Sequence, residues 1–214
     1  MKHPEAALRA YRDLLVAEPV SVTSVRDPEA AWDLHVVDAL TALDLVLRLE
    51  PGTVVDVGSG GGSPGVPIAI AIGIDVTLLE ASAAKCDFLR RTASALGLRC
   101  PVVHERSEDF ARGDGREAFD LALARALAPP AAASELCLPL VRTGGHVLLW
   151  TADTDVAALE RAASEVGGAL AEAAAVRPNR HLVLLAKRAP TPERFPRRPG
   201  MATKRPLGQV RSRT

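Results

Sequence analysis

The chain has 214 residues, 48% of them hydrophobic, and its 26 basic and 26 acidic side chains give a formal net charge of zero. This length suits a single domain with a sizeable core. No apolar run approaches the roughly 18–20 residues of a membrane span, and residues 1–5 show no signal-peptide pattern, so we expect a cytoplasmic protein without membrane contact.

Two helices are predicted in the first fifty residues. Apolar side chains recur at helical spacing over residues 4–17. They are Leu8, Tyr11, Leu14 and Leu15. A second helix should begin at Asp27-Pro28, with the aspartate as its cap and the proline in its first turn, and should end near Glu50-Pro51-Gly52. The apolar face of that helix would comprise Trp32, Val36, Leu40, Leu43 and Val46. We expect residues 1–50 to form a helical extension.

Beyond residue 52 the pattern predicts alternating strands and helices. Strands are expected at 53–57, 75–80, 101–104, 119–124, 145–150, 172–177 and 181–187. Helices are expected at 66–72, 83–97, 130–141 and 153–166. The last two strands would form a hairpin through a turn at residues 177–180. This order predicts an α/β fold with a doubly wound, mainly parallel seven-stranded sheet, Rossmann-like, whose domain spans residues 51–188.

The most informative stretch is VVDVGSGGGSPG at residues 54–65, a short strand followed by a glycine-rich loop and a helix start. Glycine lets the backbone turn tightly and approach a ligand closely. Such a loop at the carboxyl end of a parallel strand is where α/β sheets bind nucleotides. Gly58 and Gly60 are therefore candidate cofactor-binding residues.

The details of the loop favour S-adenosylmethionine over a dinucleotide. Gly60, Gly62 and Gly65 match the dinucleotide spacing, but the match begins two residues late, since Gly58 is the first residue after the strand. Asp56 also precedes the loop, whereas a pyrophosphate prefers bare backbone N–H groups. A cofactor with a cationic amino-acid end tolerates such an acid. An NAD-dependent reductase is therefore a remote alternative.

Glu80 ends the next apolar run, 20 residues after Gly60. An acid at the end of the second strand can accept both ribose hydroxyls of a nucleoside. The competing interpretation is an acid that stabilises the N-terminus of the following helix. We favour the ribose role because the glycine loop precedes it.

Seven stretches of the chain resemble the bacterial ribosomal RNA small subunit methyltransferase G family, the 16S rRNA guanine-N7 methyltransferases also called glucose-inhibited division protein B. They keep the family's order and spacing. The stretches are VTSVRDP at 22–28, HVVDAL at 35–40, DVGSGGGSPGVP at 56–67, LLE at 78–80, FL at 88–89, RSE at 106–108 and ARA at 124–126. The Gly-x-Pro-Gly-x-Pro loop and the Arg-Ala pair are specific to this family.

The resemblance implies a set of cofactor-binding residues in this chain. They are Gly58, Gly60, Ser63, Glu80, Ser107, Glu108 and Arg125. Ser63 stands where the family usually has leucine. Ser107 and Glu108 would lie against the adenine, and Ser107 could at the same time cap a short helical turn. Arg125 would contact the cofactor, could also position RNA through a bidentate contact, and is less expected to be purely structural.

Charge is unevenly distributed along the chain. Residues 187–214 carry a net charge of +8, so the remainder carries −8. A basic arm on an acidic body suggests a polyanionic partner, although a solubilising disordered tail is the alternative. The segment at 195–207 resembles the family's C-terminus, which implies RNA contact. The candidate RNA-binding residues are Arg125, Arg197, Arg198, Lys204 and Arg205. We expect residues 189–214 to form a basic tail.

Cysteine and histidine give no sign of a metal site. Cys86, Cys100 and Cys137 are odd in number and lack ligand spacing, so we expect reduced, buried side chains. His35 follows a leucine where the family has arginine, and we expect it to pack within its helix through a hydrogen bond to backbone. His104, His146 and His181 are scattered.

The implied chemistry needs no catalytic side chain. Guanine N7 has a free lone pair and no proton to remove, so we name no general base, and holding N7 in line with the sulfonium methyl would supply the rate. The predicted activity is methylation of N7 of a guanosine in 16S rRNA by a monomer acting on small ribosomal subunits. The alternatives are a small-molecule methyltransferase and a non-catalytic RNA-binding assembly factor.

Overall fold

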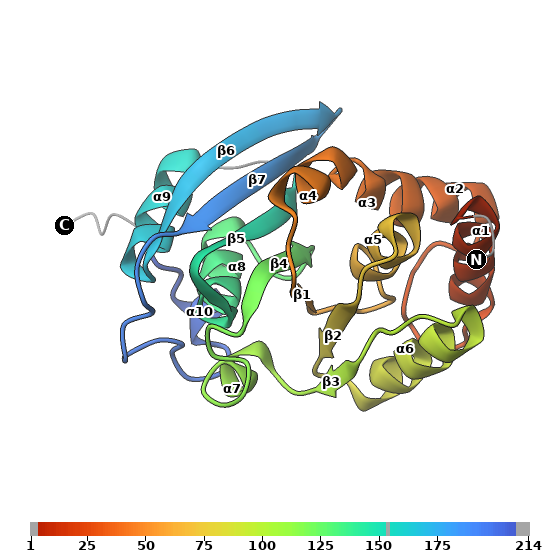
Figure 1. The fold of residues 1–214 in the computed structure, drawn as a ribbon, viewed down its shortest axis with the longest axis horizontal. Helices are drawn as coiled ribbons and strands as arrows, with labels where there is room; N and C mark the ends of the chain where they lie inside the picture. The colour runs from red at the N-terminus through yellow and green to blue at the C-terminus, as the bar shows by residue number, and fades with distance from the viewer. Residues whose placement is uncertain (1–3, 153–154, 209–214) are drawn as a thin grey trace. The chain divides into compact units, whose positions relative to one another are not determined.

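The structure, a computed structural model, describes residues 4–152 and 155–208. The chain divides into two compact units, residues 1–105 and 106–214 (Figure 1). The sequence-based boundaries at residues 50 and 188 remain a prediction about how the chain is organised. None of the helices in the described ranges is long and apolar enough to cross a membrane.

The first unit opens with a helical region. Its elements are α1 Pro4–Ala17, α2 Pro28–Trp32, a π-helical turn Asp33–Val37, α3 Asp38–Leu40 and α4 Leu43–Leu49. The predicted cap is confirmed, because Asp27 Oδ1 accepts a hydrogen bond of 2.8 Å from Ala30 N. The C-cap of α4 is Glu50, which has a positive φ of 45°.

The prediction of one continuous second helix was wrong. The π turn and the break at residues 41–42 divide it into three helices. A π turn widens the helix locally and rotates the residues that follow. Val36 and Val46 are therefore fully buried, as expected, while Trp32, Leu40 and Leu43 are only half-buried.

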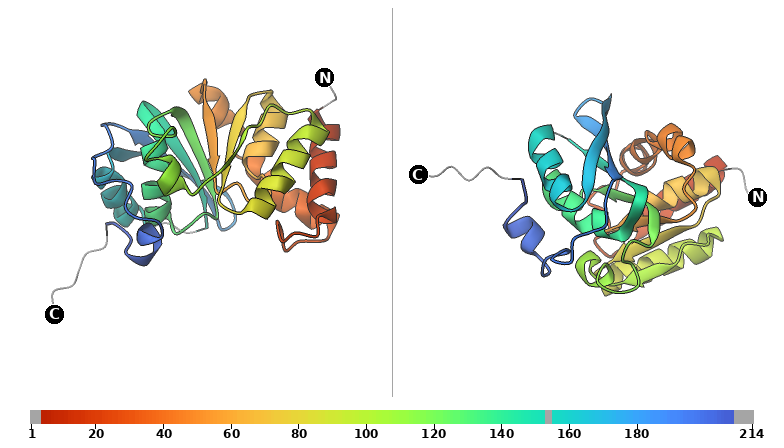
Figure 2. Two further views of the ribbon diagram at one scale, coloured as in Figure 1. Left: turned by 90° about the horizontal axis from the view of Figure 1, so that it is seen from below. Right: turned by 60° about the vertical axis from the view of Figure 1, so that its left-hand side comes forward.

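Three parallel strands form the sheet of the first unit, in the order β3-β2-β1. They are β1 Val54–Val57, β2 Val76–Glu80 and β3 Val102–His104. Helix α5 Gly65–Ile72 follows β1, and α6 Ala83–Leu96 follows β2. Helix α1 packs against both α5 and α6, and Figure 2 shows α1 beside α6. All four residues of β1 are buried, so the glycine loop begins from a rigid strand.

The second unit holds the remaining strands, in the order β4-β5-β7-β6. They are β4 Phe119–Arg125, β5 Val141–Thr151, β6 Gly168–Arg177 and β7 Arg180–Lys187. Strand β4 is parallel to β5, whereas β7 is antiparallel to both β5 and β6. The predicted hairpin turn is confirmed, with Asn179 at a φ of 55°. Seven strands in a mainly parallel sheet with flanking helices confirm the predicted α/β fold class.

Several boundaries in the second unit differ from prediction. Strands β5 and β6 each begin four residues earlier than expected. In β5 the early start includes a register shift against β4 between the residues paired with Val141 and His146. The helices are α7 Ser107–Phe110, α8 Pro130–Cys137 with a 3-10 turn at Leu138–Leu140, α9 Val156–Glu165 and α10 Met201–Lys204. Helix α8 is therefore shorter than predicted, and α10 was not predicted. The first residues of the predicted helix at 153–166 lie outside the described residues.

Candidate functional site

The glycine loop joins the end of β1 to the start of α5. Gly58 N donates to Leu79 O at 2.8 Å, so the loop leaves β1 attached to β2. Gly58 and Gly60 have φ angles of 70° and 56°, a left-handed conformation that side chains other than glycine rarely adopt. Gly62 N then donates to Ser59 O at 2.6 Å and closes the turn.

The glycines of the loop have different neighbours. A Cβ at Gly61 would lie 2.7 Å from Leu15 Cδ2, and one at Gly62 would lie 2.8 Å from Val66 Cγ2. A Cβ at Gly60 would find no atom nearer than Gly58 O at 3.8 Å. Gly61 and Gly62 thus serve close packing within the protein, while the backbone at Gly60 borders open space that a ligand can enter.

Asp56 stabilises the start of α5. Its carboxylate is 1% exposed, and Oδ2 accepts a hydrogen bond of 3.1 Å from Gly65 N. A Cβ at Gly65 would lie 2.8 Å from this same oxygen, which explains the glycine there. The acid that distinguished this loop from a dinucleotide site therefore also has a structural role in the loop-to-helix turn.

Glu80 links the glycine loop to β2. Its Oε2 accepts from Gly60 N at 2.9 Å, and its Oε1 accepts from Ser82 N at 2.8 Å. The side chain is 8% exposed. A carboxylate offers about four acceptor positions, so these two bonds orient Glu80 and leave others for hydroxyl donors. Gly58, Gly60 and Glu80 are thus brought together as predicted.

Ser63 faces the helical region of the same unit. Its Oγ donates to His35 O at 2.7 Å, so the hydroxyl proton is already used in a hydrogen bond within the protein. A contact between Ser63 and the cofactor stays a prediction. His35 is buried, and its Nε2 lies 2.8 Å from Thr23 Oγ1. The expected packing role of His35 is confirmed, although this hydrogen bond joins it to a side chain rather than to backbone.

In the second unit, Ser107 and Glu108 form the first turn of α7. The N-cap is Arg106, whose side chain makes no capping bond, and Ser107 is the first residue of the helix, so the expectation that Ser107 is the cap was wrong. Glu108 is 4% exposed, and its Oε1 accepts from Gly200 N at 2.8 Å. The carboxylate therefore contacts the C-terminal segment, and a role for either residue at the adenine stays a prediction.

Arg125 ends β4, as predicted. It is half-buried and stands in register with Trp150 on β5. Ala126 follows with a φ of 54°, a conformation that costs a non-glycine residue about 1–2 kcal/mol. This turn changes the direction of the chain immediately after Arg125. Contacts of Arg125 with cofactor or RNA stay predictions.

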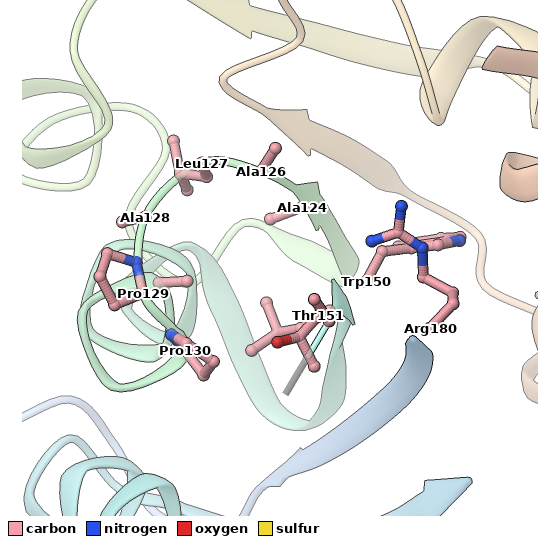
Figure 3. A pocket seen from close by; sticks show the side chains of 12 residues that line it. Ala124, Ala126, Leu127, Ala128, Pro129, Pro130, Trp150, Thr151 and Arg180 are labelled. Atoms are coloured by element: carbon pink, nitrogen blue, oxygen red, sulfur yellow. The ribbon is translucent and has the colours of Figure 1, made fainter. Parts of the chain in front are cut away.

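A cavity of about 310 Å³ lies at the carboxyl ends of β4 and β5. Figure 3 shows Leu127, Pro129 and Pro130 on one side and Trp150 and Arg180 on the other. The wall is mainly apolar. Its other residues are Ala124, Ala126, Ala128, Ala133, Leu149, Thr151 and Ala152. Sequence reasoning missed this cavity, because Arg180 reaches it from a hairpin whose position depends on the whole sheet.

The basic residues of the C-terminus have different environments. Arg198, Lys204 and Arg205 are exposed. Arg197 is partly buried and pairs with Glu135, with Nε 2.7 Å from Oε1. Lys187 was counted in the basic arm, but it is 1% exposed and its Nζ donates to Leu138 O at 3.0 Å. Arg211 and Arg213 lie outside the described residues.

Comparison with known proteins places the chain in a family. The family model described as rRNA small subunit methyltransferase G matches residues 5–183. The chain belongs to this family. Its similarity extends to curated members named ribosomal RNA small subunit methyltransferase G. The member from Staphylococcus carnosus is 36% identical over 93% of this chain and 89% of its own, and that from Symbiobacterium thermophilum is 38% identical over 89% and 84%.

Membership of the rRNA small subunit methyltransferase G family confirms the predicted class of enzyme, an rRNA methyltransferase that uses S-adenosylmethionine. Solved structures agree on the fold. A branched-chain polyamine synthase from Thermus thermophilus has a TM-score of 0.63 at 15% identity, over 87% of this chain and 64% of its own. A point mutant of MtNAS, in complex with S-adenosylmethionine, has a TM-score of 0.58 at 16% identity, over 86% and 73%.

Proposed function

We propose that this chain transfers the methyl group of S-adenosylmethionine to N7 of a guanosine in 16S ribosomal RNA. The observation that supports the proposal most directly is the bond between Gly60 N and Glu80 Oε2. The bond holds Gly60, which has a left-handed backbone conformation and borders open space, beside the Glu80 carboxylate. That carboxylate can accept further hydrogen bonds.

These residues fit the cofactor. The ribose of S-adenosylmethionine carries two hydroxyl donors, and Glu80 is anchored by two backbone N–H groups in an orientation from which it can accept them. A side chain at Gly60 would occupy the open space beside that carboxylate. In the second unit, we propose that Ser107 and Glu108 border the adenine through their backbone and that Arg125 contacts the cofactor.

The cofactor supplies an electrophilic methyl group when bound. The protein has to hold guanine N7 in line with that methyl group, because the N7 lone pair attacks without losing a proton. No side chain therefore needs to act as a general base. The anchored loop at Gly58 and Gly60 suits this task, since its backbone is attached to β2 by hydrogen bonds.

Exposed cations of the C-terminal segment would bind the RNA backbone. Arg198, Lys204 and Arg205 are exposed, and each phosphate contact adds salt-dependent affinity through release of counterions. Arg197 pairs with Glu135, so we now assign it to the structure of the segment. We propose a monomer that acts in the cytoplasm on assembled or nearly assembled small subunits, where a folded RNA loop exposes a base edge.

The test is methyl transfer from labelled S-adenosylmethionine to small subunits that lack the modification. Naked 16S rRNA and free guanosine nucleotides serve as parallel substrates, and nucleoside mass spectrometry identifies the product. We expect 7-methylguanosine from subunits and much less from free nucleotides. Cofactor binding without transfer to any RNA would overturn the proposal.

A further inference from the structure

Three acidic side chains of the second unit hold the segment from residue 191 to residue 205. Glu117 Oε1 accepts from Thr191 N. Glu135 pairs with the guanidinium of Arg197. Glu108 Oε1 accepts from Gly200 N at 2.8 Å. Glu108 and Glu135 are nearly fully buried, so neither is an ordinary surface acid.

Two arginines bind the backbone of the same segment. Arg112 Nη2 donates to Pro196 O at 3.1 Å and to Arg197 O at 2.8 Å. Arg116 donates to Phe195 O at 3.0 Å and to Thr191 O at 2.9 Å. Together with the acids, these bonds give the segment donors and acceptors along most of its length.

Apolar contacts complete the attachment. Phe195 is buried, and Ala202 of α10 packs against Ala132 and Leu136 of α8. Gly200 is the N-cap of α10, with a φ of 79°, and Glu108 accepts its N–H. The hydrogen bond from Gly200 N to Glu108 therefore holds the residue at which α10 begins. Helix α10 carries Lys204, one of the exposed cations.

We infer that Glu108 is a positioning residue for the RNA-contacting segment and that its carboxylate is not a ligand of the cofactor. The inference rests on the proposed function, because it assumes that the exposed cations of the segment contact RNA. Holding Arg198, Lys204 and Arg205 in a fixed place before binding removes part of the ordering cost of association. Loss of the Glu108 bond should therefore weaken RNA binding without changing the binding of S-adenosylmethionine.

The test compares Glu108→Ala with wild type in three measurements. We expect the Kd for labelled S-adenosylmethionine to change by less than about twofold. The KM for small subunits should rise roughly tenfold while kcat changes little. A tenfold rise is the size expected for loss of a hydrogen bond to a charged group. Limited trypsin digestion after Arg194 and Lys204, neither of which precedes a proline, should become several-fold faster, since local opening governs cleavage. Glu108→Gln keeps an acceptor oxygen for Gly200 N and should restore most of the KM.

Arg112→Ala provides a second test in case Glu108→Ala, a substitution at a buried site, fails to fold. It removes two bonds to the same segment but leaves the Glu108 carboxylate in place, and it should reproduce the raised KM and the faster digestion. Glu193→Gln, an exposed acid of the segment, is the matched control and should behave as wild type. Neither cofactor binding nor digestion depends on methyl transfer, so they test Glu108 even if the proposed function fails.

A loss of S-adenosylmethionine affinity of tenfold or more in Glu108→Ala, with unchanged trypsin digestion, would overturn the inference. That result would assign the carboxylate to the cofactor. Unchanged digestion in both Glu108→Ala and Arg112→Ala would also overturn it, because the segment would then not depend on these bonds.

Discussion

Gly60 donates its backbone N–H to the carboxylate of Glu80 at 2.9 Å, across 20 residues of sequence. The bond joins the loop after β1 to the end of β2. It places a carboxylate beside the open space at Gly60 while the second carboxylate oxygen remains bound to Ser82 N. Any change at either residue therefore acts on both loop geometry and the proposed ribose contact.

Alanine at Gly60 and at Gly61 should destabilise the protein in both cases but weaken cofactor binding mainly at Gly60. Gly60→Ala meets no nearby atom but forces alanine to a φ of 56°, which costs about 1–2 kcal/mol, and the new methyl occupies the proposed ligand space. Gly61→Ala collides with Leu15 and should lower the free energy of unfolding by about 1–3 kcal/mol. Equilibrium dialysis with S-adenosylmethionine separates the two, and urea unfolding measures the stability cost of each. We expect at least a roughly tenfold weaker Kd for Gly60→Ala. Equal Kd values for both variants would contradict the proposed site.

Glu80→Gln should weaken cofactor binding and also lower the free energy of unfolding. A carboxamide offers one acceptor oxygen, so its NH₂ group must face the N–H of Gly60 or Ser82, and one of these donors loses its partner. Hydrogen bonds to charged groups contribute about 1.5–3 kcal/mol, so the Kd for S-adenosylmethionine should rise by roughly tenfold or more. Isothermal titration calorimetry measures it. Glu105→Gln, at an exposed acid of the same unit, serves as the control. An unchanged Kd in Glu80→Gln would exclude the ribose contact.

Tyr11→Phe should destabilise the first unit. Tyr11 is fully buried, and its hydroxyl donates to Gly61 O at 2.9 Å. Removing the hydroxyl leaves a buried carbonyl without this donor, which costs about 1–3 kcal/mol. Denaturant unfolding should show the loss as a lower midpoint with an unchanged slope. A midpoint equal to that of wild type would show that this bond adds nothing to stability.

The buried Lys187 should make stability rise with pH on the alkaline side. Burial lowers the pKa of Lys187 to about 8, although Glu117 partly opposes the shift. The unfolded chain keeps this proton up to the ordinary lysine pKa of 10.5. Between these values the unfolded state binds more protons, so the free energy of unfolding should increase with pH by about 3 kcal/mol from this group.

Lys187→Met lacks this titration and provides the comparison. The difference in unfolding free energy between wild type and Lys187→Met should grow in favour of wild type as the pH rises from about 8 toward the ordinary lysine pKa. The exposed Lys204→Met controls for the loss of a charge and should parallel wild type. Parallel profiles for all three proteins would show that burial leaves the pKa of Lys187 unshifted.

Neutralising the three exposed cations of the C-terminal segment should reduce the salt dependence of subunit binding. Each phosphate contact contributes about 0.7–0.9 to the slope of log affinity against log salt concentration. The combined substitution of Arg198, Lys204 and Arg205 by alanine should therefore lower the slope by about 2–3. Filter binding to small subunits at several salt concentrations measures it. A slope equal to that of wild type would exclude RNA contact by these side chains.

Local patterns in the sequence predicted the local features of the site. The cap at Asp27, the glycine loop after β1 and the acid at the end of β2 depend on neighbouring residues, and each was found where expected. Even so, the two hydrogen bonds of Glu80 were not predicted, because they depend on how the loop folds back to β2.

Long-range contacts account for what sequence reasoning missed. Ser63 donates to His35 O, 28 residues earlier, and Glu108 accepts from Gly200 N, 92 residues later. Lys187 and Arg197 count as basic residues in any composition, yet one is buried and the other pairs with Glu135. No pattern within a short window carries such information, since tertiary packing decides the partner.

The contact of Tyr11 and Leu15 with Gly61 makes the N-terminal helix part of the support for the glycine loop. Any ligand that requires the loop in its folded shape stabilises this helix as well, by mass action. Saturating S-adenosylmethionine should then slow hydrogen exchange at the backbone amides of α1. Fusions or truncations at the N-terminus should correspondingly alter the affinity for S-adenosylmethionine.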